Sequence, residues 1–358
     1  MSLGIDLENE ILAWLPPKSL MRFRCVQKSW NLLFETPNFY KKWRMNMSDC
    51  RSDHVIFYEK QPYVTLLSSD NLIHIRSLYY QAIEIKSYGS CNGVFCLSAL
   101  FRFNSSWFDQ LIMWNPVTRE VHRIPPTPCL NSGSPLYGFG ADDPNSTDFK
   151  IVRLHTGYDG TAEVYSLSTK SWITTQNPPP FIIMTRRRLN TKFNTLVKRV
   201  YHWITNNPKD DNYNGANILC FNFQNNQFGQ LRGPTFSYED YYFLWDDVAE
   251  IKGSLAYVAY VLQRNSPERV SLKIWVLDQS GWNKEYNINL VSHFHLCGLW
   301  KNGTQFFGGY LEGSLTSRDR QGNTICRFDQ IPVGFTKYWV HEYMPSIAPL
   351  GTRQYIYD

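Results

Sequence analysis

An aromatic strand-and-turn unit recurs through most of this chain at nearly constant spacing. Each unit has an apolar strand, a turn that carries Asn, Asp or Ser, and a second strand. The steps from one central aromatic residue to the next are 51, 56, 54 and 53 residues, counted along Trp114, Tyr165, Phe221, Trp275 and Phe328. Repeats of about 50 residues with about four strands each are typical of kelch-type propeller blades, which bury their faces against one another. Residues 55–358 are therefore predicted to form a β-propeller-like domain of about six blades.

A second repeated element lies between these hairpins, where a turn leads into a strand. It occurs at residues 90–97, 197–203, 251–257 and 300–306. Aromatic residues make up 16% of the chain, and they suit the pleated surface of a sheet better than a helix. A closed ring also leaves few strand edges unpaired, which protects such an aromatic chain from aggregation. The chain is therefore expected to be mainly β.

The first fifty residues follow a helical pattern instead. Over residues 6–15 the apolar side chains recur at the spacing of one amphipathic helical face, at Leu7, Ile11, Trp14 and Leu15. Pro16 and Pro17 end this helix, a second helix is predicted over 18–34, and Pro37 opens a third helix that extends to residue 47. Three short helices cannot bury all of this apolar surface within themselves, so part of it is expected to contact a partner.

Residues 10–30 carry a specific resemblance. Their sequence, EILAWLPPKSLMRFRCVQKSW, resembles the plant F-box pattern EIL-x-x-LP-x-KSL-x-RF-x-C-x-x-KSW. The resemblance implies a three-helix F-box over residues 1–47, which packs against the Skp-type adaptor of a cullin-based ligase. The adaptor contacts that it implies are Leu7, Ile11, Leu12, Leu15, Pro16 and Leu20.

The sequence departs from the F-box pattern at its start. Ser2-Leu3-Gly4-Ile5-Asp6 stands where the family usually has Leu-Pro-x-Asp/Glu, just upstream of the first helix. The first contact with the adaptor is expected to be weaker as a result. An alternative interpretation is that the apolar stripe is the ordinary core of an N-terminal helical hairpin that packs on the rest of the chain.

Residues 48–358 resemble the plant F-box-associated domain. The landmarks GxCNG, NPxTR and PP occur in the family's order at 89–93, 115–119 and 125–126, followed by GFG at 138–140 and DFKIVR at 148–153. Within this family the sequence is most similar to the S-locus F-box subfamily of self-incompatible plants. The associated domain of that subfamily recognises secreted-style ribonucleases, the S-RNases, and the resemblance implies the same class of target here.

These landmarks also have a purely structural interpretation. Asn115 and Pro116 suit a hairpin turn, because Asn supplies a local side-chain hydrogen bond and Pro presets φ. Gly93 permits a positive φ before a strand. On this interpretation the landmarks build blades and do not touch a target.

Two clusters are candidates for binding the target. Arg186, Arg187 and Arg188 could bind carboxylates or phosphates bidentately on an acidic protein surface, and the alternative is a solvated loop. Aromatic residues between Phe236 and Trp245 could form a hot spot, and the alternative is core packing. The residues selected from this second cluster are Tyr241, Tyr242 and Trp245.

These observations predict the substrate receptor of an SCF-type ubiquitin ligase, which recruits a target protein, such as an S-RNase, for ubiquitination and proteasomal degradation. An alternative is a stand-alone propeller that binds a glycan or nucleic acid without a ligase role. An enzyme is not expected, because the sequence has no GxSxG, P-loop, dinucleotide-binding glycine motif or HExxH.

Charge and cysteine content exclude several other classes. A net charge of +5 is small for a dedicated nucleic-acid binder. The 8 cysteines form no CxxC pair or zinc-type spacing. His293 and His295 could begin a metal site, but no third and fourth ligands can be named and the alternative is ordinary polar strand positions, so neither a metal nor another cofactor is expected. The sequence has neither a secretory signal nor a long apolar run, which predicts a cytoplasmic or nuclear protein without a membrane partner.

Overall fold

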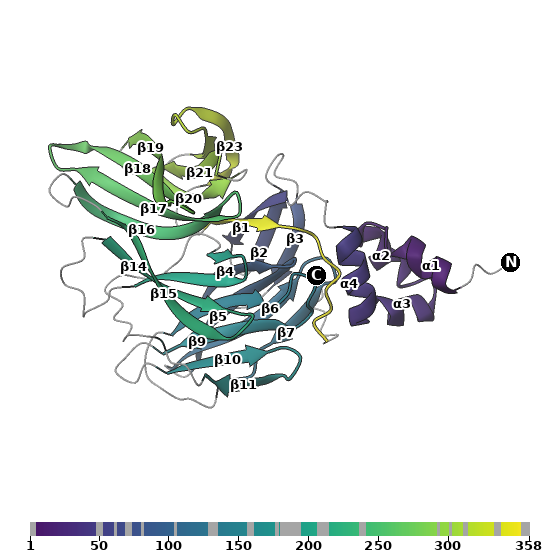
Figure 1. The fold of residues 1–358 in the computed structure, drawn as a ribbon. Helices are drawn as coiled ribbons and strands as arrows, with labels where there is room; N and C mark the ends of the chain where they lie inside the picture. Colours follow the sequence, from purple (N-terminus) through teal and green to yellow (C-terminus); the bar gives the residue numbers. More distant parts are fainter. Residues whose placement is uncertain are drawn as a thin grey trace.

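The computed structural model consists of an N-terminal helical bundle and a larger β-sheet domain (Figure 1). None of the described helices is long and apolar enough to cross a membrane. The structure describes residues 5–47, 53–60, 63–68, 74–79, 82–103, 106–127, 135–155, 161–175, 179, 195–205, 215–235, 241–291, 294–300, 303–310, 314–332 and 338–351.

The bundle has four helices where three were predicted. They are α1 (Ile5–Leu12), α2 (Pro17–Phe23), α3 (Lys28–Phe34) and α4 (Pro37–Asn46). The helix expected over 18–34 is interrupted, because Gln27, the residue before α3, is extended (φ −145°, ψ 134°). In one straight helix Leu20 and Phe34 would lie about 20 Å apart. The break lets α3 fold back on α2, so that both side chains enter one core.

The described strands form six four-stranded antiparallel sheets in a β-propeller. The closing sheet contains β24 (Tyr338–Tyr343), β1 (Asp53–Lys60), β2 (Tyr63–Ser68) and β3 (His74–Tyr79). The next two contain β4 (Glu84–Cys91), β5 (Val94–Phe103), β6 (Ser106–Asn115) and β7 (Glu120–Arg123), then β8 (Leu136–Ala141), β9 (Phe149–Leu154), β10 (Ala162–Ser166) and β11 (Ser171–Thr174).

The other three sheets follow in chain order. They contain β12 (Leu196–Val197), β13 (Val200–Thr205), β14 (Gly215–Asn222) and β15 (Gln227–Thr235), then β16 (Tyr241–Ile251), β17 (Ser254–Gln263), β18 (Ser266–Asp278) and β19 (Gly281–Val291), and finally β20 (Phe294–Trp300), β21 (Gln305–Tyr310), β22 (Ser314–Arg318) and β23 (Thr324–Pro332).

The last strand of the domain closes the ring. β24 pairs with β1, from Tyr343 opposite Asp53 to Tyr338 opposite Tyr58, so one sheet combines the beginning and the end of the domain. β24 also contacts β4 on one side and β20 on the other. The ring is therefore closed by hydrogen bonds between strands that most of the domain separates in sequence.

Neighbouring sheets share hydrophobic clusters. On β5, Phe95 and Leu97 pack with Leu66 and Tyr343 of the closing sheet. The alternate residue Cys96 lies in the cluster shared with the sheet of β8–β11. This alternation is that of a strand whose two faces are both buried, and it explains why so many strands are apolar at every position.

The repeats seen in the sequence correspond to the sheets, with one error. Trp114, Tyr165, Phe221 and Trp275 lie in β6, β10, β14 and β18, the third strand of each sheet. The fifth equivalence is wrong, because Phe328 lies in β23, the fourth strand of its sheet. The third strand there, β22, has no aromatic residue, so the spacing selected the next aromatic strand along the chain.

Candidate functional site

An exposed apolar surface lies on α1 and the turn that follows it. Leu7, Ile11 and Trp14 have 49%, 49% and 62% of their surface exposed. Leu7 and Ile11 are spaced four apart, so they lie on one side of the helix, and Trp14 follows in the turn after α1. We call these three residues the α1 face. Large apolar side chains that are exposed together mark a binding surface, whereas isolated ones are common on any protein.

Side chains of α4 hold the end of α1 in place. Trp43 Nε1 donates to the Leu15 carbonyl at 3.0 Å, and Asn46 Nδ2 donates to the Ala13 carbonyl at 3.2 Å. These carbonyls follow the last turn of α1, where the helix itself offers no partner. Lys42 also forms an ion pair with Glu10. The α1 face is therefore presented by a fixed helix.

The structure separates the six adaptor contacts expected from the sequence. Those that retain exposed surface are Leu7, Ile11, Leu15 and Pro16. Leu12 and Leu20 are only 3% and 0% exposed and lie in the core of the chain. In this conformation these two side chains pack inside the chain, and the exposed surface is that of the other four. The six adaptor contacts stay predictions.

Trp14 is the functional candidate that the sequence analysis passed over. It belongs to the predicted stripe, but the F-box resemblance did not select it. Its backbone N–H donates to the Ile11 carbonyl at 3.2 Å in the turn after α1. The direction of its side chain depends on that turn, which apolar spacing along a helix does not specify.

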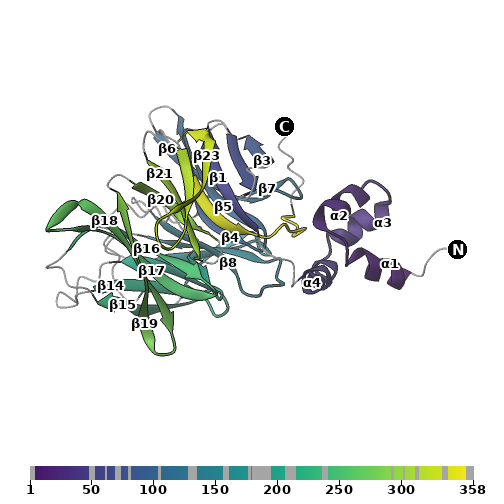
Figure 2. The same cartoon turned by 90° about the horizontal axis from the view of Figure 1, so that it is seen from above.

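The opposite side of the bundle rests on the propeller and on the residues after β24, and the C-terminal segment runs toward the helices (Figure 2). Arg24 Nη1 lies 3.8 Å from Glu120 Oε1, and Arg44 Nη1 donates to Met344 Sδ at 2.9 Å. Tyr40 lies in the same hydrophobic cluster as residues of the propeller, and burial raises its pKa to about 12, so its hydroxyl stays protonated. The chain thus covers this side of the bundle itself.

The expected target-binding residues are described only in part. Arg186, Arg187 and Arg188 lie outside the described residues. Tyr241, Tyr242 and Trp245 lie in β16, and of these three only the backbone is described. A β-bulge separates Phe243 from Trp245, and the extra residue, Leu244, exposes half of its surface. The sequence did not predict this bulge, which changes which face of the sheet the following residues occupy.

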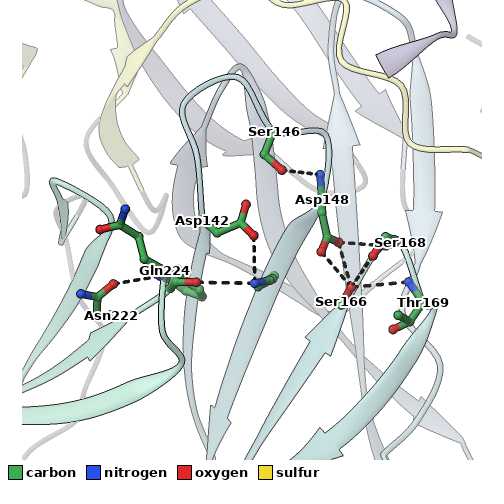
Figure 3. Close-up of polar contacts among 10 residues, drawn as sticks. Asp142, Ser146, Asp148, Ser166, Ser168, Thr169, Asn222 and Gln224 are labelled. Atoms are coloured by element: carbon green, nitrogen blue, oxygen red, sulfur yellow. Dashed lines mark hydrogen bonds and ion pairs between the residues drawn. The ribbon is translucent and has the colours of Figure 1, made fainter. Parts of the chain in front are cut away.

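Carboxylates near the short turns serve to bind those turns together (Figure 3). The carboxylate of Asp148 accepts hydrogen bonds from Ser166 Oγ at 2.8 and 3.0 Å and from the Ser168 N–H at 2.8 Å. Asp142 forms an ion pair with Lys150 at 3.2 Å. Within the described ranges, no group of three or more His, Cys, Asp and Glu residues could hold a metal ion.

Glu163 is the centre of a buried polar cluster between sheets. Its Oε2 lies 3.5 Å from Arg153 Nη1 and 3.1 Å from His155 Nε2, and Thr127 Oγ1 donates to the same oxygen. Each of these contacts compensates the charge or the hydrogen-bonding capacity of a buried group. The cluster therefore fastens the segment after β7 to the next sheet, which is a structural role.

Two family profiles match the chain in succession. The F-box domain profile matches residues 1–42, and the F-box associated beta propeller domain profile matches residues 43–311, most of the chain. This chain belongs to the F-box-associated propeller family. Proteins with these two domains are typically non-catalytic adaptors. The match ends before β22, β23 and β24, which the structure places in the same propeller.

Curated relatives of this family member include F-box proteins of Arabidopsis thaliana. One is 28% identical over 240 residues, which cover 65% of this chain and 61% of the relative. An F-box/kelch-repeat protein is 22% identical over 328 residues, covering 82% and 81%. A further F-box protein is 30% identical over 244 residues, covering 64% and 60%. The chain therefore spans less than two thirds of the first and third of these relatives.

Proposed function

We propose that this protein is the substrate-receptor subunit of an SCF-type (Skp/cullin/F-box) ubiquitin ligase. Residues 1–47 dock a Skp-type adaptor, which links the chain to a cullin. Residues 48–358 recruit a target protein for ubiquitination and proteasomal degradation. The receptor breaks no bond itself, and its contribution is to hold the target close to the ubiquitin-conjugating enzyme.

The observation that carries this proposal is the contrast between the two sides of the bundle. The side formed by Phe39, Tyr40 and Trp43 is covered by the chain itself, whereas Leu7 and Ile11 remain exposed. An apolar face that its own protein leaves open favours a protein partner. The match to the F-box domain over residues 1–42 supports a Skp-type adaptor as the class of partner.

Adaptor binding to the full-length chain tests the proposal. We expect the wild-type protein to co-purify with a Skp-type adaptor and the Ile11→Asp variant to lose the adaptor, because docking would bury an unpaired carboxylate. Ile11 is half exposed, so the variant is expected to keep its fold. The measurement is the adaptor dissociation constant by calorimetry, with circular dichroism to verify folding.

The matched control is Ile173→Asp on β11. Ile173 is 62% exposed and far from α1 in the chain, so it receives the same change of chemistry outside the helical bundle. We expect the control to bind the adaptor as the wild type does. Undiminished binding by Ile11→Asp would reject α1 as the docking surface, and a wild-type chain that binds no adaptor would favour a stand-alone binding propeller.

The proposal also names a class of target protein. The resemblance to the S-locus F-box subfamily supports an S-RNase as target, and Arg186–Arg188 with Tyr241, Tyr242 and Trp245 are the proposed contacts. A binding assay with an S-RNase and with an unrelated secreted ribonuclease separates recognition of this class from general affinity for ribonucleases. Equal binding of the two, or binding of neither, would reject this target.

A further inference from the structure

The residues that follow β24 form a buried strap between the helices and the propeller. We call residues 344–350 the C-terminal strap, and in Figure 1 the yellow end of the chain runs from β24 toward α4. The strap is neither helix nor strand, yet Ser346, Ile347, Ala348 and Leu350 are 0% exposed. A buried segment without a strand partner needs other groups to satisfy its backbone.

One side chain of the propeller satisfies two carbonyls of the strap. Asn115 Nδ2 donates to the Ser346 carbonyl at 3.1 Å and to the Ala348 carbonyl at 2.8 Å. The oxygen of the same amide accepts from the Val117 N–H at 3.0 Å and the Thr118 N–H at 3.3 Å. Asn115 therefore builds its own turn with one end of the amide and holds the strap with the other.

Two further residues of the same sheet fit the strap. Glu120 Oε2 accepts from the Leu350 N–H at 2.7 Å. Gly93 has φ +77°, and a Cβ at this position would lie 2.4 Å from the Met344 carbonyl oxygen and 2.4 Å from Ser346 Cβ. Glycine is thus required here both by the backbone conformation and by the closeness of the strap.

The helices hold the other side of the strap. Arg44 of α4 donates to Met344, and the Tyr40 side chain lies beside Ser346. Arg24 lies 3.8 Å from Glu120, the carboxylate that also binds the strap. The apolar residues Ile347 and Leu350 share one core cluster with residues of α4 and of β5. The strap therefore contacts both parts of the molecule at once.

We infer that Asn115 and Glu120 are positioning residues that fix the orientation of the helical bundle relative to the propeller. Asn115 acts through the C-terminal strap, and Glu120 acts through both the strap and its ion pair with Arg24. The role of this connection between bundle and propeller rests on the proposed receptor function. A fixed angle between the adaptor-docking helices and the propeller holds a bound target in one place relative to the ligase. With the strap released, the bundle keeps its adaptor surface and loses its fixed orientation.

A purely local role for Asn115 is the competing explanation, and the molecule contains a matched comparison. Asn222 occupies the same position in the sheet of β12–β15, where it pairs with Gln227 as Asn115 pairs with Glu120. Its Oδ1 accepts from the Gln224 N–H at 2.8 Å, so it builds the same kind of turn (Figure 3). The contacts with the strap distinguish Asn115 from Asn222.

Asn115→Asp with Asn222→Asp as control separates the two roles in the full-length chain. Each substitution keeps the turn acceptor and replaces the amide nitrogen with an oxygen. At position 115 the new oxygen faces two carbonyl oxygens of the strap and repels them. Spin labels introduced as unnatural amino acids at Lys18 and Lys170, both exposed, report the distance distribution between bundle and propeller.

We expect a narrow distance distribution in the wild type and in Asn222→Asp, and loss of the narrow distribution in Asn115→Asp with unchanged adaptor affinity. A merely structural role would lower the melting temperature of Asn115→Asp and leave the distribution narrow, which would overturn the inference. The adaptor measurement tests the proposed function separately, because the distance distribution is recorded without the adaptor.

Hydrogen exchange of the wild-type chain covers the case in which Asn115→Asp does not fold. The inference requires the Leu350 amide, which donates to Glu120, to exchange as slowly as amides of β24. Glu120→Gln keeps an acceptor for Leu350 and removes the charge that faces Arg24, so it is expected to broaden the distance distribution while the strap stays protected. Exchange of the Leu350 amide at the rate of an unstructured peptide would refute the inference that the C-terminal strap fixes the bundle to the propeller.

Discussion

Helices α1 and α4 belong to one small bundle and are both amphipathic, yet the α1 face and the aromatic residues of α4 have opposite environments. On α4, Phe39, Tyr40 and Trp43 are buried in a cluster that extends into the propeller. On α1, Leu7 and Ile11 face solvent. Both sequences carry apolar residues at helical spacing. What differs is the presence of the propeller and the C-terminal strap on one side of the bundle.

This difference teaches that an apolar stripe indicates which side of a helix must be buried. It does not indicate whether the same chain or a partner protein buries that side. The chain supplies the cover for α4 and leaves the α1 face to a partner. Substitutions on the two helices should therefore have opposite consequences. Those at the buried aromatic residues of α4 should lower stability, and those on the α1 face should lower partner binding.

The largest expected effect is that of Trp43→Ala. Trp43 is 1% exposed and donates a hydrogen bond to the Leu15 carbonyl, so its removal leaves a cavity and an unsatisfied carbonyl. We expect a loss of about 3–5 kcal/mol in the free energy of unfolding of the bundle, measured by urea titration. Trp14→Ala is the matched control on the α1 face and should change stability by less than about 0.5 kcal/mol. Equal losses for the two variants would remove the contrast between the helices.

Gly93→Ala is expected to come next, and it tests the covered side of the bundle from the propeller. The new methyl group meets the strap at 2.4 Å, and alanine is strained at φ +77°. We expect the steric contact and the backbone strain together to lower the free energy of unfolding by about 3 kcal/mol. Gly253→Ala is the control, since Gly253 has φ +74° with nothing within 4 Å and therefore reports the backbone cost alone, about 1 kcal/mol. A smaller loss at Gly93 than at Gly253 would contradict close contact with the strap.

The sequence was sufficient for local features. Pro37 begins a helix as expected, and the two repeated elements mark the turns of the sheets. It was insufficient where the outcome depends on residues far apart in the chain. The local turn at Asn115 was predicted, whereas its bonds to Ser346 and Ala348 join residues more than two hundred positions away, which no local pattern encodes.

The same reason explains why the sequence does not separate buried from exposed residues in the candidate site. Leu12 and Leu20 match the F-box pattern as well as Ile11 does, and only the packing of α1 and α2 decides which of them remain exposed. The break at Gln27 was missed because the apolar stripe continues across it. In that segment the stability of a shared core for Leu20 and Phe34 outweighs the continuity of a helix.

The pH dependence of stability should differ between the propeller and the helical bundle. Burial lowers the pKa of His341, on the closing strand β24, to about 4. The unfolded chain takes up a proton near pH 6.5, and the folded chain does so only near pH 4. Within that window the unfolded state binds more protons, so stability falls as the pH is lowered, by about 1.4 kcal/mol per pH unit for this residue, and the fall ends below pH 4.

His341→Asn is expected to reduce this slope, as measured by urea titrations at several pH values. Burial also lowers the pKa of His202 to about 4, so the variant retains part of the slope. The first fifty residues contain no histidine, and adaptor binding at the α1 face should not follow this titration. A wild-type slope in the variant would show that His341 does not contribute to the pH dependence of ring closure.

The smallest expected effect is that of Glu10→Gln, which removes the ion pair between α1 and Lys42 of α4. Both side chains are well exposed, so solvent and salt screen the pair, and its loss should cost less than about 0.5 kcal/mol in a urea titration. The hydrogen bonds from Trp43 and Asn46 to the end of α1 remain in this variant and should keep the α1 face in place for the adaptor. A loss above about 1 kcal/mol, abolished by high salt, would mean that charge and not the buried contacts of α4 holds α1, and the two helices would then differ less than their burial indicates.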